Sequence, residues 1–356
     1  MLTEKERLIA VLSGKKADRT PLICSGGMMS MANIEVMEMT KCYWPEAHRS
    51  PKKMARLVKA MHDITGIENM GVPFCMTVEA EAFGSQVNYG CARVHPRVVK
   101  EVMQTIRDTK KLKKLDPQRD GRMPVVLDAI GYLQDLNEGV PVIGNLVGPA
   151  SLAGLVLEPL TLLRLMRKDK DGVHQLLSFT TDNLIEFAKA QVRYGADVIT
   201  ISEPTATGEI LGPQSFSEFV IPYINRITAV LGKLGVKTIV HICGDLRTIL
   251  YRVKNPSAIG PQVLQLEADC ISIDAMVNIR SMKKLKKDLR LMGNVSIFLL
   301  EKDTPDRISR IARAIIRNGI DILAPACGLS PMTPTENIRA MSNVACTSYT
   351  ESDLVL

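Results

Sequence analysis

Short apolar runs of strand type alternate with longer amphipathic segments along almost the whole chain, and this alternation is the strongest constraint on its fold. The segments at 172–195 and 306–319 have the apolar spacing of surface helices, and each ends at a glycine. Strands that alternate with helices pair in parallel, because each return crossover needs a helix. Eight runs of strand type are present, at 21–25, 66–72, 140–146, 196–202, 237–243, 270–274, 290–295 and 321–327.

Eight such units predict an α/β fold of the (β/α)8 TIM-barrel type rather than an open sheet. A chain of 356 residues is compatible with one barrel domain. We expect this domain to span 1–345, with a C-terminal tail at 346–356. The amphipathic N-terminus predicts a helix added to the barrel, and the basic segment 91–121 predicts an insertion of helix and loop on its rim.

The composition excludes several classes of protein. No apolar run approaches the roughly 20 residues needed to span a bilayer, and the N-terminus lacks the pattern of a signal peptide, so we expect a cytoplasmic protein without a membrane segment. Eight cysteines in such a chain are expected to be mostly reduced. The net charge is +7, but the lysine clusters at 110–114 and 283–287 contain no interleaved aromatics, so we expect no nucleic-acid partner. The minority interpretation of these clusters is a surface that binds an acidic partner protein.

Polar and thiol side chains collect where the predicted strands end, which is where barrel enzymes place their chemistry. His241 and Cys243 are two residues apart, so they point to the same side of an extended strand. Cys327 follows 84 residues after Cys243, at the end of the last run. In a closed barrel the fifth and eighth strands face one another across the mouth, so these three side chains can converge.

An imidazole and two thiolates form a donor set that suits zinc, and three protein ligands leave a fourth position open, as in catalytic zinc sites. Considered alone, His241 would be interpreted as a histidine of the core and Cys243 as a small buried residue, with no role in a site. The joint pattern favours a site, because each residue lies at a strand end and glycine, including Gly328, follows each cysteine. We therefore predict about one zinc ion per chain. After Cys327, Thr333 is expected to cap a helix that starts at Pro334, with Glu336 completing a capping box.

The strings HICGD, LMGNVS and DILAPACGLSPMTPTENIRAM closely resemble the methylcobamide:coenzyme M methyltransferases of methylotrophic methanogens, a branch of the uroporphyrinogen decarboxylase superfamily. The strings WPEAH, PFCMTVEAEAFG, GPASLA and GADVITISEP also match, so the resemblance runs to about Met341. It implies a zinc-bearing (β/α)8 barrel that moves a methyl group from methyl-Co(III) on a corrinoid protein to a small thiol acceptor, coenzyme M above all.

The resemblance also suggests further site residues. Related zinc methionine synthases add a carboxylate at the fourth zinc position, and Asp274 is the candidate for it, with Glu267 as the alternative. Glu81, Glu203, Asn294 and Gly328 are candidate substrate-binding residues, although Glu203 stands where the family leads us to expect aspartate.

Two other functions remain open at this point. One is the same methyl transfer with tetrahydrofolate as acceptor, and the other is a non-catalytic barrel that binds a corrinoid. Two thiolates on zinc favour a thiol acceptor, and the complete ligand set favours turnover. Uroporphyrinogen decarboxylase itself matches poorly, because its arginine-rich N-terminal motif is reduced here to Arg19. Oligomeric state and the identity of the corrinoid protein stay open.

Overall fold

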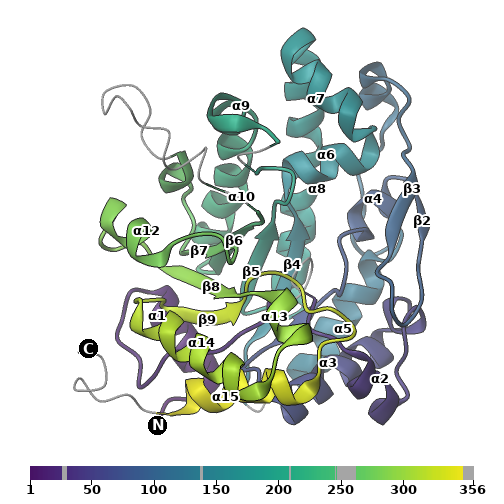
Figure 1. Ribbon diagram of the computed structural model, residues 1–356. Helices are drawn as coiled ribbons and strands as arrows, with labels where there is room; N and C mark the ends of the chain where they lie inside the picture. Colours follow the sequence, from purple (N-terminus) through teal and green to yellow (C-terminus); the bar gives the residue numbers. More distant parts are fainter. Residues whose placement is uncertain (26–29, 137–138, 208–209, 245, 247–261, 348–356) are drawn as a thin grey trace.

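A computed structural model describes residues 1–25, 30–136, 139–207, 210–244, 246 and 262–347. Seven parallel strands form one curved sheet in the order β1-β4-β5-β6-β7-β8-β9, so each strand after β1 is added beside the preceding one (Figure 1). The strands are β1 (Met70–Val72), β4 (Val142–Val147), β5 (Val198–Ser202), β6 (Lys237–Ile242), β7 (Cys270–Ile273), β8 (Leu291–Val295) and β9 (Ile322–Pro325).

The eighth predicted run, at 21–25, is not a full strand, but it occupies the gap between β9 and β1. Leu22 forms a single parallel bridge to Leu323 on β9. On its other side, the backbone N–H of Glu68 donates to the carbonyl of Leu22 at 2.8 Å. The predicted barrel is therefore correct, while the first of its eight predicted strands is shortened to a seam segment, 21–24, with one bridge.

Helices cover the outer face of this sheet and return the chain between strands. Their amphipathic character explains this position, since α3 buries Met54, Leu57, Val58 and Met61 and leaves lysines outside. The α-helices are α1 (Glu4–Leu12), α2 (Ile34–Thr40), α3 (Pro51–Thr65), α4 (Val78–Ala82), α5 (Met123–Asp135), α6 (Pro149–Val156), α7 (Pro159–Lys168), α8 (Lys170–Arg193), α9 (Gly212–Phe219), α10 (Ile221–Lys233), α12 (Ile279–Leu285), α13 (Ile297–Lys302), α14 (Pro305–Arg317) and α15 (Thr335–Cys346). Single 3-10 turns are η1 (Glu46–His48), η2 (Ile106–Lys111) and η3 (Gln262–Gln265).

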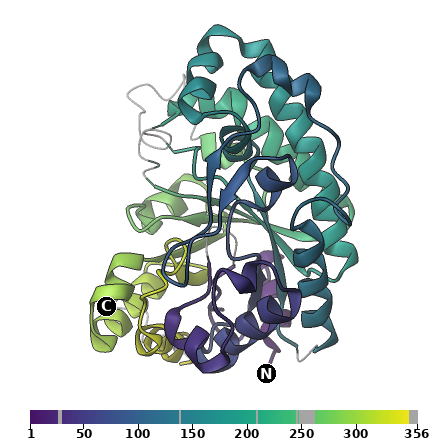
Figure 2. The same cartoon turned by 90° about the vertical axis from the view of Figure 1, so that its right-hand side faces the viewer.

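The rim insertion between β1 and α5 contains more strand than its sequence predicted. β2 (Gln86–Asn88) and β3 (Arg97–Lys100) form an antiparallel hairpin, and η2 follows. Figure 2 shows this hairpin in front of the barrel strands. The prediction of helix and loop alone was wrong, because these two strands are mostly exposed and carry none of the apolar runs that marked the barrel strands.

The C-terminal boundary differs slightly from the expected one. α15 continues through Cys346, and positions 348–356 of the expected tail lie outside the described residues. α15 starts at Thr335 with Pro334 at its cap and has no side-chain capping bond of its own. The predicted capping box is thus wrong, because Glu35 on α2 accepts from the N–H of Thr335 at 2.9 Å instead.

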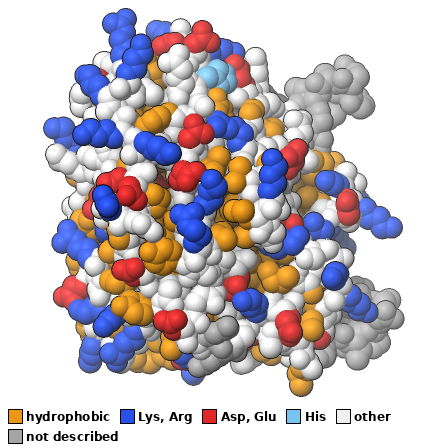
Figure 3. All heavy atoms as spheres, turned by 180° about the vertical axis from the view of Figure 1, so that it is seen from behind, with side chains coloured by type: hydrophobic (Ala, Val, Ile, Leu, Met, Phe, Trp, Pro, Cys, Tyr) orange, Lys and Arg blue, Asp and Glu red, His pale blue; other side chains and the backbone are white. Residues whose placement is uncertain are grey.

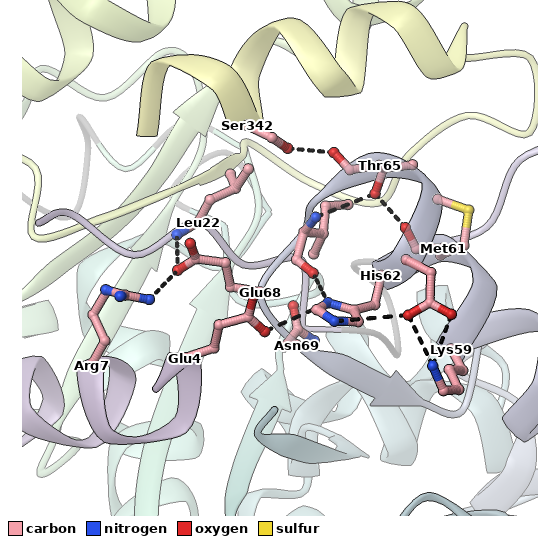
Figure 4. Close-up of polar contacts among 12 residues, drawn as sticks. Glu4, Arg7, Leu22, Lys59, Met61, His62, Thr65, Glu68, Asn69 and Ser342 are labelled. Carbon is pink, nitrogen blue, oxygen red and sulfur yellow. Dashed lines mark hydrogen bonds and ion pairs between the residues drawn. The ribbon is translucent and has the colours of Figure 1, made fainter. Parts of the chain in front are cut away.

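A buried ion cluster holds the seam segment at the end of the barrel opposite to its mouth, the mouth being the end where the strands finish (Figure 4). Glu68 is 2% exposed and pairs with Arg7 at 3.4 Å and with Arg19. Its carboxylate also accepts from the N–H of Leu22. Nearby, the Ser342 hydroxyl of α15 donates to the carbonyl of Thr65 at 2.6 Å. These contacts tie α1, α3, α15 and the seam together.

Within the described residues, no helix combines the length and apolar character that a membrane crossing requires. On the face seen in Figure 3, Lys and Arg side chains are interspersed with Asp, Glu and apolar side chains.

Candidate metal centre and family

Strand register brings the candidate ligands to the mouth of the barrel. His241 on β6 pairs with Ser202 on β5 and with Ser272 on β7, so these side chains form one layer across three neighbouring strands. Cys243 follows the end of β6 directly, and Cys327 lies two residues past the end of β9. The C-terminal ends of parallel strands meet at one end of the barrel, and the three candidates therefore lie there together.

The three side chains converge closely. The sulfur atoms of Cys243 and Cys327 are 3.7 Å apart. One donor atom from each of His241, Cys243 and Cys327 lies within 4.8 Å of the other two. The Nδ1 atom of His241 is 2.9 Å from the Ser272 hydroxyl, while its Nε2 atom is buried with no hydrogen-bond partner. A buried ring nitrogen without a partner, next to two thiols, fits the place of a metal ion.

The donor chemistry matches zinc in particular. Imidazole nitrogen and thiolate sulfur are its usual protein ligands, and three of them leave a coordination position open. The hydrogen bond between the two thiols shifts their pKa values in opposite directions. It raises the pKa of Cys243 and lowers the pKa of Cys327. A metal ion bound by both sulfurs would require both thiols to lose their protons.

The described cavities do not coincide with this cluster. A cavity of about 560 Å³ lies at the opposite end of the barrel, where Lys15, Lys287 and Arg290 line it. Its lining comes from segments that precede strands, so it is separate from the mouth. The candidate site is therefore identified by its converging donor atoms and not by a cavity.

Comparison with known proteins agrees with this geometry. The uroporphyrinogen decarboxylase (URO-D) family description matches residues 3–347. A methylcobamide:CoM methyltransferase of Methanosarcina acetivorans is 33% identical over 345 residues, which is 96% of this chain and 97% of the relative. The chain belongs to the uroporphyrinogen decarboxylase family, in the branch of the methylcobamide:CoM methyltransferases. It is therefore an enzyme of the methyltransferase class.

Two further relatives support this membership. A solved methyltransferase from Methanosarcina mazei superposes with a TM-score of 0.88 at 31% identity and covers 97% of this chain and 98% of its own. A methylated-thiol–coenzyme M methyltransferase of the same species is 28% identical over 341 residues, covering 95% of this chain and 88% of that protein. The family's barrel fold thus agrees with the fold predicted from the alternation of strands and helices.

Among the carboxylates considered as a fourth ligand in this methyltransferase, Asp274 and Glu267 lie at opposite ends of β7. Asp274 follows the strand, and its carboxylate accepts from the Cys243 thiol at 3.8 Å and from the Gly244 N–H at 3.1 Å. It adjoins the three ligand atoms without belonging to their group. Glu267 precedes the strand and is exposed, and its N–H donates to Asn225. The structure therefore does not bring Glu267 to the cluster.

The remaining predicted site residues mostly have partners within the protein. Glu81 pairs with Arg122 and accepts from Tyr89. Asn294 donates to the carbonyls of Asp274 and Val277, each at 3.0 Å. The Gly328 N–H donates to the Cys327 sulfur and so contributes to lowering its pKa. Of these candidates, Gly328 is the one in contact with the cluster, Asn294 supports the loop that follows β7, and Glu81 joins α4 to Tyr89 and Arg122.

Glu203 is fully buried, and its carboxylate caps the start of α6. It accepts from the backbone N–H groups of Ala150 and Ser151, at 2.9 and 2.8 Å, and from the Ser151 hydroxyl. Burial raises the pKa of Glu203 to about 7, against the opposing effect of these donors. Its described contacts make it a support for α6 rather than a group that faces the cluster.

Two residues of this end of the barrel escaped sequence reasoning. Ser272 bonds to His241 through strand register, and register between β6 and β7 is invisible until the two strands are paired. Glu79 is a buried carboxylate whose Oε1 accepts from the Val147 N–H at 3.0 Å. It lies in the string PFCMTVEAEAFG, beside the predicted Glu81, and burial is the signal that separates the two.

Glu79 should make folding stability depend on pH. Burial raises its pKa to about 7, whereas an unfolded glutamate titrates near 4.5. The folded protein therefore keeps a proton that the unfolded chain releases, and stability falls as pH rises from about 4.5 to 7. We expect Glu79→Gln to remove this loss and to raise the free energy of unfolding at pH 8 by on the order of 1–3 kcal/mol relative to the parent.

Urea unfolding at pH 5 and pH 8 measures this effect. The two proteins should have similar stability at pH 5, where both side chains are neutral, and should differ at pH 8. Glu38→Gln is the control, because Glu38 is exposed on α2. An equal difference at both pH values would mean that the titration of Glu79 is not the cause.

Proposed function

We propose that this enzyme transfers a methyl group from a methylated corrinoid, carried by a partner protein, to the thiol of coenzyme M, with zinc held by His241, Cys243 and Cys327. The observation that carries the proposal is the convergence of these three donors at the mouth, with the buried Nε2 of His241 directed at no other partner. The matched relatives are named for methylcobamide and coenzyme M, which supports the same donor and acceptor here.

The protein's own residues have three tasks in this proposal. His241, Cys243 and Cys327 hold the metal, and Ser272 orients the imidazole ring. Zinc, when bound, lowers the pKa of a coordinated thiol, so an acceptor thiol at the open position would be present as thiolate near neutral pH. Asp274, next to Cys243, is the carboxylate positioned to receive the proton that the acceptor thiol releases. We propose it for that role rather than as a fourth ligand.

The transfer itself is a single displacement on the methyl carbon. The acceptor sulfur forms a bond to carbon while the cobalt–carbon bond breaks, and its electron pair stays on cobalt, which goes from Co(III) to Co(I). No external oxidant or reductant is needed within this step. In this proposal the step takes place at the mouth of the barrel, beside the half-buried thiols Cys243 and Cys327.

Tetrahydrofolate is the alternative acceptor. An amine nitrogen is already unprotonated near pH 7, so it gains little from the thiol activation that zinc provides. The test is turnover of zinc-loaded protein with free methylcobalamin and equal concentrations of coenzyme M or tetrahydrofolate, followed by the loss of methylcobalamin absorbance. We expect methylation of coenzyme M. Methylation of tetrahydrofolate alone would overturn the acceptor, and no reaction with either would overturn the proposed function.

Ser272 should contribute to metal affinity. Its hydroxyl holds Nδ1 of His241 at 2.9 Å and so leaves Nε2 for the metal. Loss of such an outer partner typically weakens metal binding by roughly 10–100-fold. We expect Ser272→Ala to lose zinc to a chelator at correspondingly lower concentration, while Ser272→Thr, which keeps the hydroxyl, stays close to the parent. Identical zinc affinity in all three proteins would contradict the orienting role.

A further inference from the structure

The sulfur atoms of Cys243 and Cys327 are in direct contact at the mouth of the barrel, 3.7 Å apart. Each cysteine belongs to the segment just after a strand, β6 for Cys243 and β9 for Cys327, and not to the strand itself. Gly244, with a φ of +78°, follows Cys243, and Gly328 follows Cys327, so a residue with few steric restrictions lies beside each sulfur. A closer approach of the two sulfurs therefore involves these segments and not the paired strands.

This contact is close to what a covalent bond between the two sulfurs requires. The sulfur atoms of a disulfide are about 2.05 Å apart, so each sulfur has to move by less than about 1 Å to reach that distance from 3.7 Å. Two thiols that the fold holds in contact also react with each other far more readily than with a thiol in solution. Both side chains are half-buried, so part of each faces solvent, from which a small oxidant arrives.

Five of the other cysteines lie in different surroundings. Cys42, Cys75 and Cys270 are buried, and their sulfur atoms contact oxygen atoms. Cys91 and Cys346 are exposed, but they lie on the rim insertion and at the end of α15, which are separate elements. Partial exposure together with a neighbouring sulfur therefore distinguishes Cys243 and Cys327 from these five.

Cys24, on the seam segment, is the rival partner for Cys327, because it lies near enough for an electrostatic interaction with it. Its side chain is fully buried, however, and its sulfur donates to the carbonyl of Ser30 at 3.6 Å. The Asn69 side chain fixes its backbone, since it accepts from the Cys24 N–H at 2.8 Å and donates to the Cys24 carbonyl at 3.0 Å. The structure therefore favours Cys243 as the partner of Cys327.

We propose that Cys243 and Cys327 form a reversible disulfide when the enzyme without its metal meets a peroxide, and that this disulfide and a bound zinc ion exclude each other. The exclusion rests on the proposed function, in which both sulfurs hold the metal. Zinc would keep the two sulfurs apart as separate ligands, each about 2.3 Å from the ion. The disulfide, in turn, has no thiolate left to bind zinc.

The oxidation proceeds in two steps that consume one peroxide. One thiol attacks the peroxide, the O–O bond breaks, and the sulfur becomes a sulfenic acid while the first water leaves. The second thiol attacks this sulfur, the S–S bond forms as the S–O bond breaks, and the second water leaves. The two sulfurs together lose two electrons, and these reduce the peroxide to water.

The experiment compares the whole chain saturated with zinc and the same chain stripped of metal by a chelator. Each is treated with an equimolar amount of hydrogen peroxide, its remaining thiols are blocked with N-ethylmaleimide, and its peptides are analysed by mass spectrometry without reduction. We expect the stripped protein to lose two of its eight thiols and to give one cross-linked peptide pair, which contains Cys243 and Cys327. The zinc-saturated protein should keep all eight, and dithiothreitol should restore both thiols and zinc binding to the oxidised protein.

Two variants test the pairing in the stripped protein. Cys243→Ser leaves Cys327 without a second thiol, so we expect further peroxide to carry Cys327 to the sulfinic acid, which dithiothreitol does not reverse. Cys91→Ser is the matched control, since Cys91 is exposed on the rim insertion, and it should form the same cross-linked pair as the parent.

Stripped protein that keeps both thiols, or that joins Cys327 to Cys24 instead, would overturn the proposal. A disulfide between Cys243 and Cys327 that forms as fast in the zinc-saturated protein would overturn the exclusion and would count against these sulfurs as zinc ligands. Absence of methyl transfer in zinc-saturated protein with all thiols intact would instead count against the proposed function alone.

Discussion

Replacing Cys327 by alanine is expected to strip the metal and abolish methyl transfer from methylcobalamin to coenzyme M. In the proposed zinc centre Cys327 is one of two sulfur ligands, and the sulfur of Cys243 is only 3.7 Å away. Removing the Cys327 sulfur should lower metal affinity by more than the roughly 10–100-fold that follows loss of a residue hydrogen-bonded to a ligand, because a direct bond to the ion is lost. Cys243→Ala should behave in the same way.

Metal content after dialysis against a weak chelator is the decisive measurement. The parent should retain about one zinc per chain, because a cluster of three ligands binds a single ion. Cys91→Ala provides the matched control, since Cys91 is an exposed cysteine on the rim insertion. A Cys327→Ala protein with undiminished zinc would remove the metal centre from the proposed function, even if turnover were lost.

The second large effect concerns stability rather than chemistry. Glu68→Ala should destabilise the protein by about 1–3 kcal/mol, because it removes the buried carboxylate that pairs with Arg19 and Arg7 and that accepts from the Leu22 N–H, although Arg7 keeps its pair with Asp18 at 2.7 Å. The seam segment relies on this carboxylate more than a strand would, since Leu22 has only one bridge to β9.

Urea unfolding of the parent and of two variants checks this expectation. Glu46→Ala is the comparison, because the Glu46–Lys53 pair is exposed and such pairs contribute roughly 0–1 kcal/mol. A Glu68→Ala protein that loses no more than the Glu46 variant would show that the seam is held by apolar packing alone. Retained metal affinity in folded Glu68→Ala would confirm that the effect is confined to the seam.

The barrel was predictable because both faces of its strands are buried. Such strands read as apolar runs, and seven of the eight runs became strands at nearly the expected positions. The run at 21–25 was indistinguishable from them by composition, yet its pairing is limited to Leu22. The β2–β3 hairpin was missed for the opposite reason, since exposed strands carry no apolar signal.

The candidate centre was predictable as far as strand ends could be placed. His241, Cys243 and Cys327 stand at or just beyond the ends of β6 and β9, and this was sufficient to bring them together. Contacts that depend on neighbouring elements were not predictable. Glu203 caps α6, and Glu35 from α2 takes the place of the predicted capping box at α15. In each case the partner is distant in sequence, so local patterns contain no trace of it.

The separation of the two thiols in sequence bears on how long the protein persists in the cell before it is degraded. Cys243 and Cys327 are 84 residues apart and belong to strands that are not neighbours. A metal ion that binds both would join the segment after β9 to the end of β6, and it would bind the folded chain only. Binding of this kind adds about 4 kcal/mol to stability when free metal exceeds Kd by a thousandfold. Under zinc scarcity the newly made chain should then open more often and be degraded faster, so that the amount of this enzyme follows the supply of its metal.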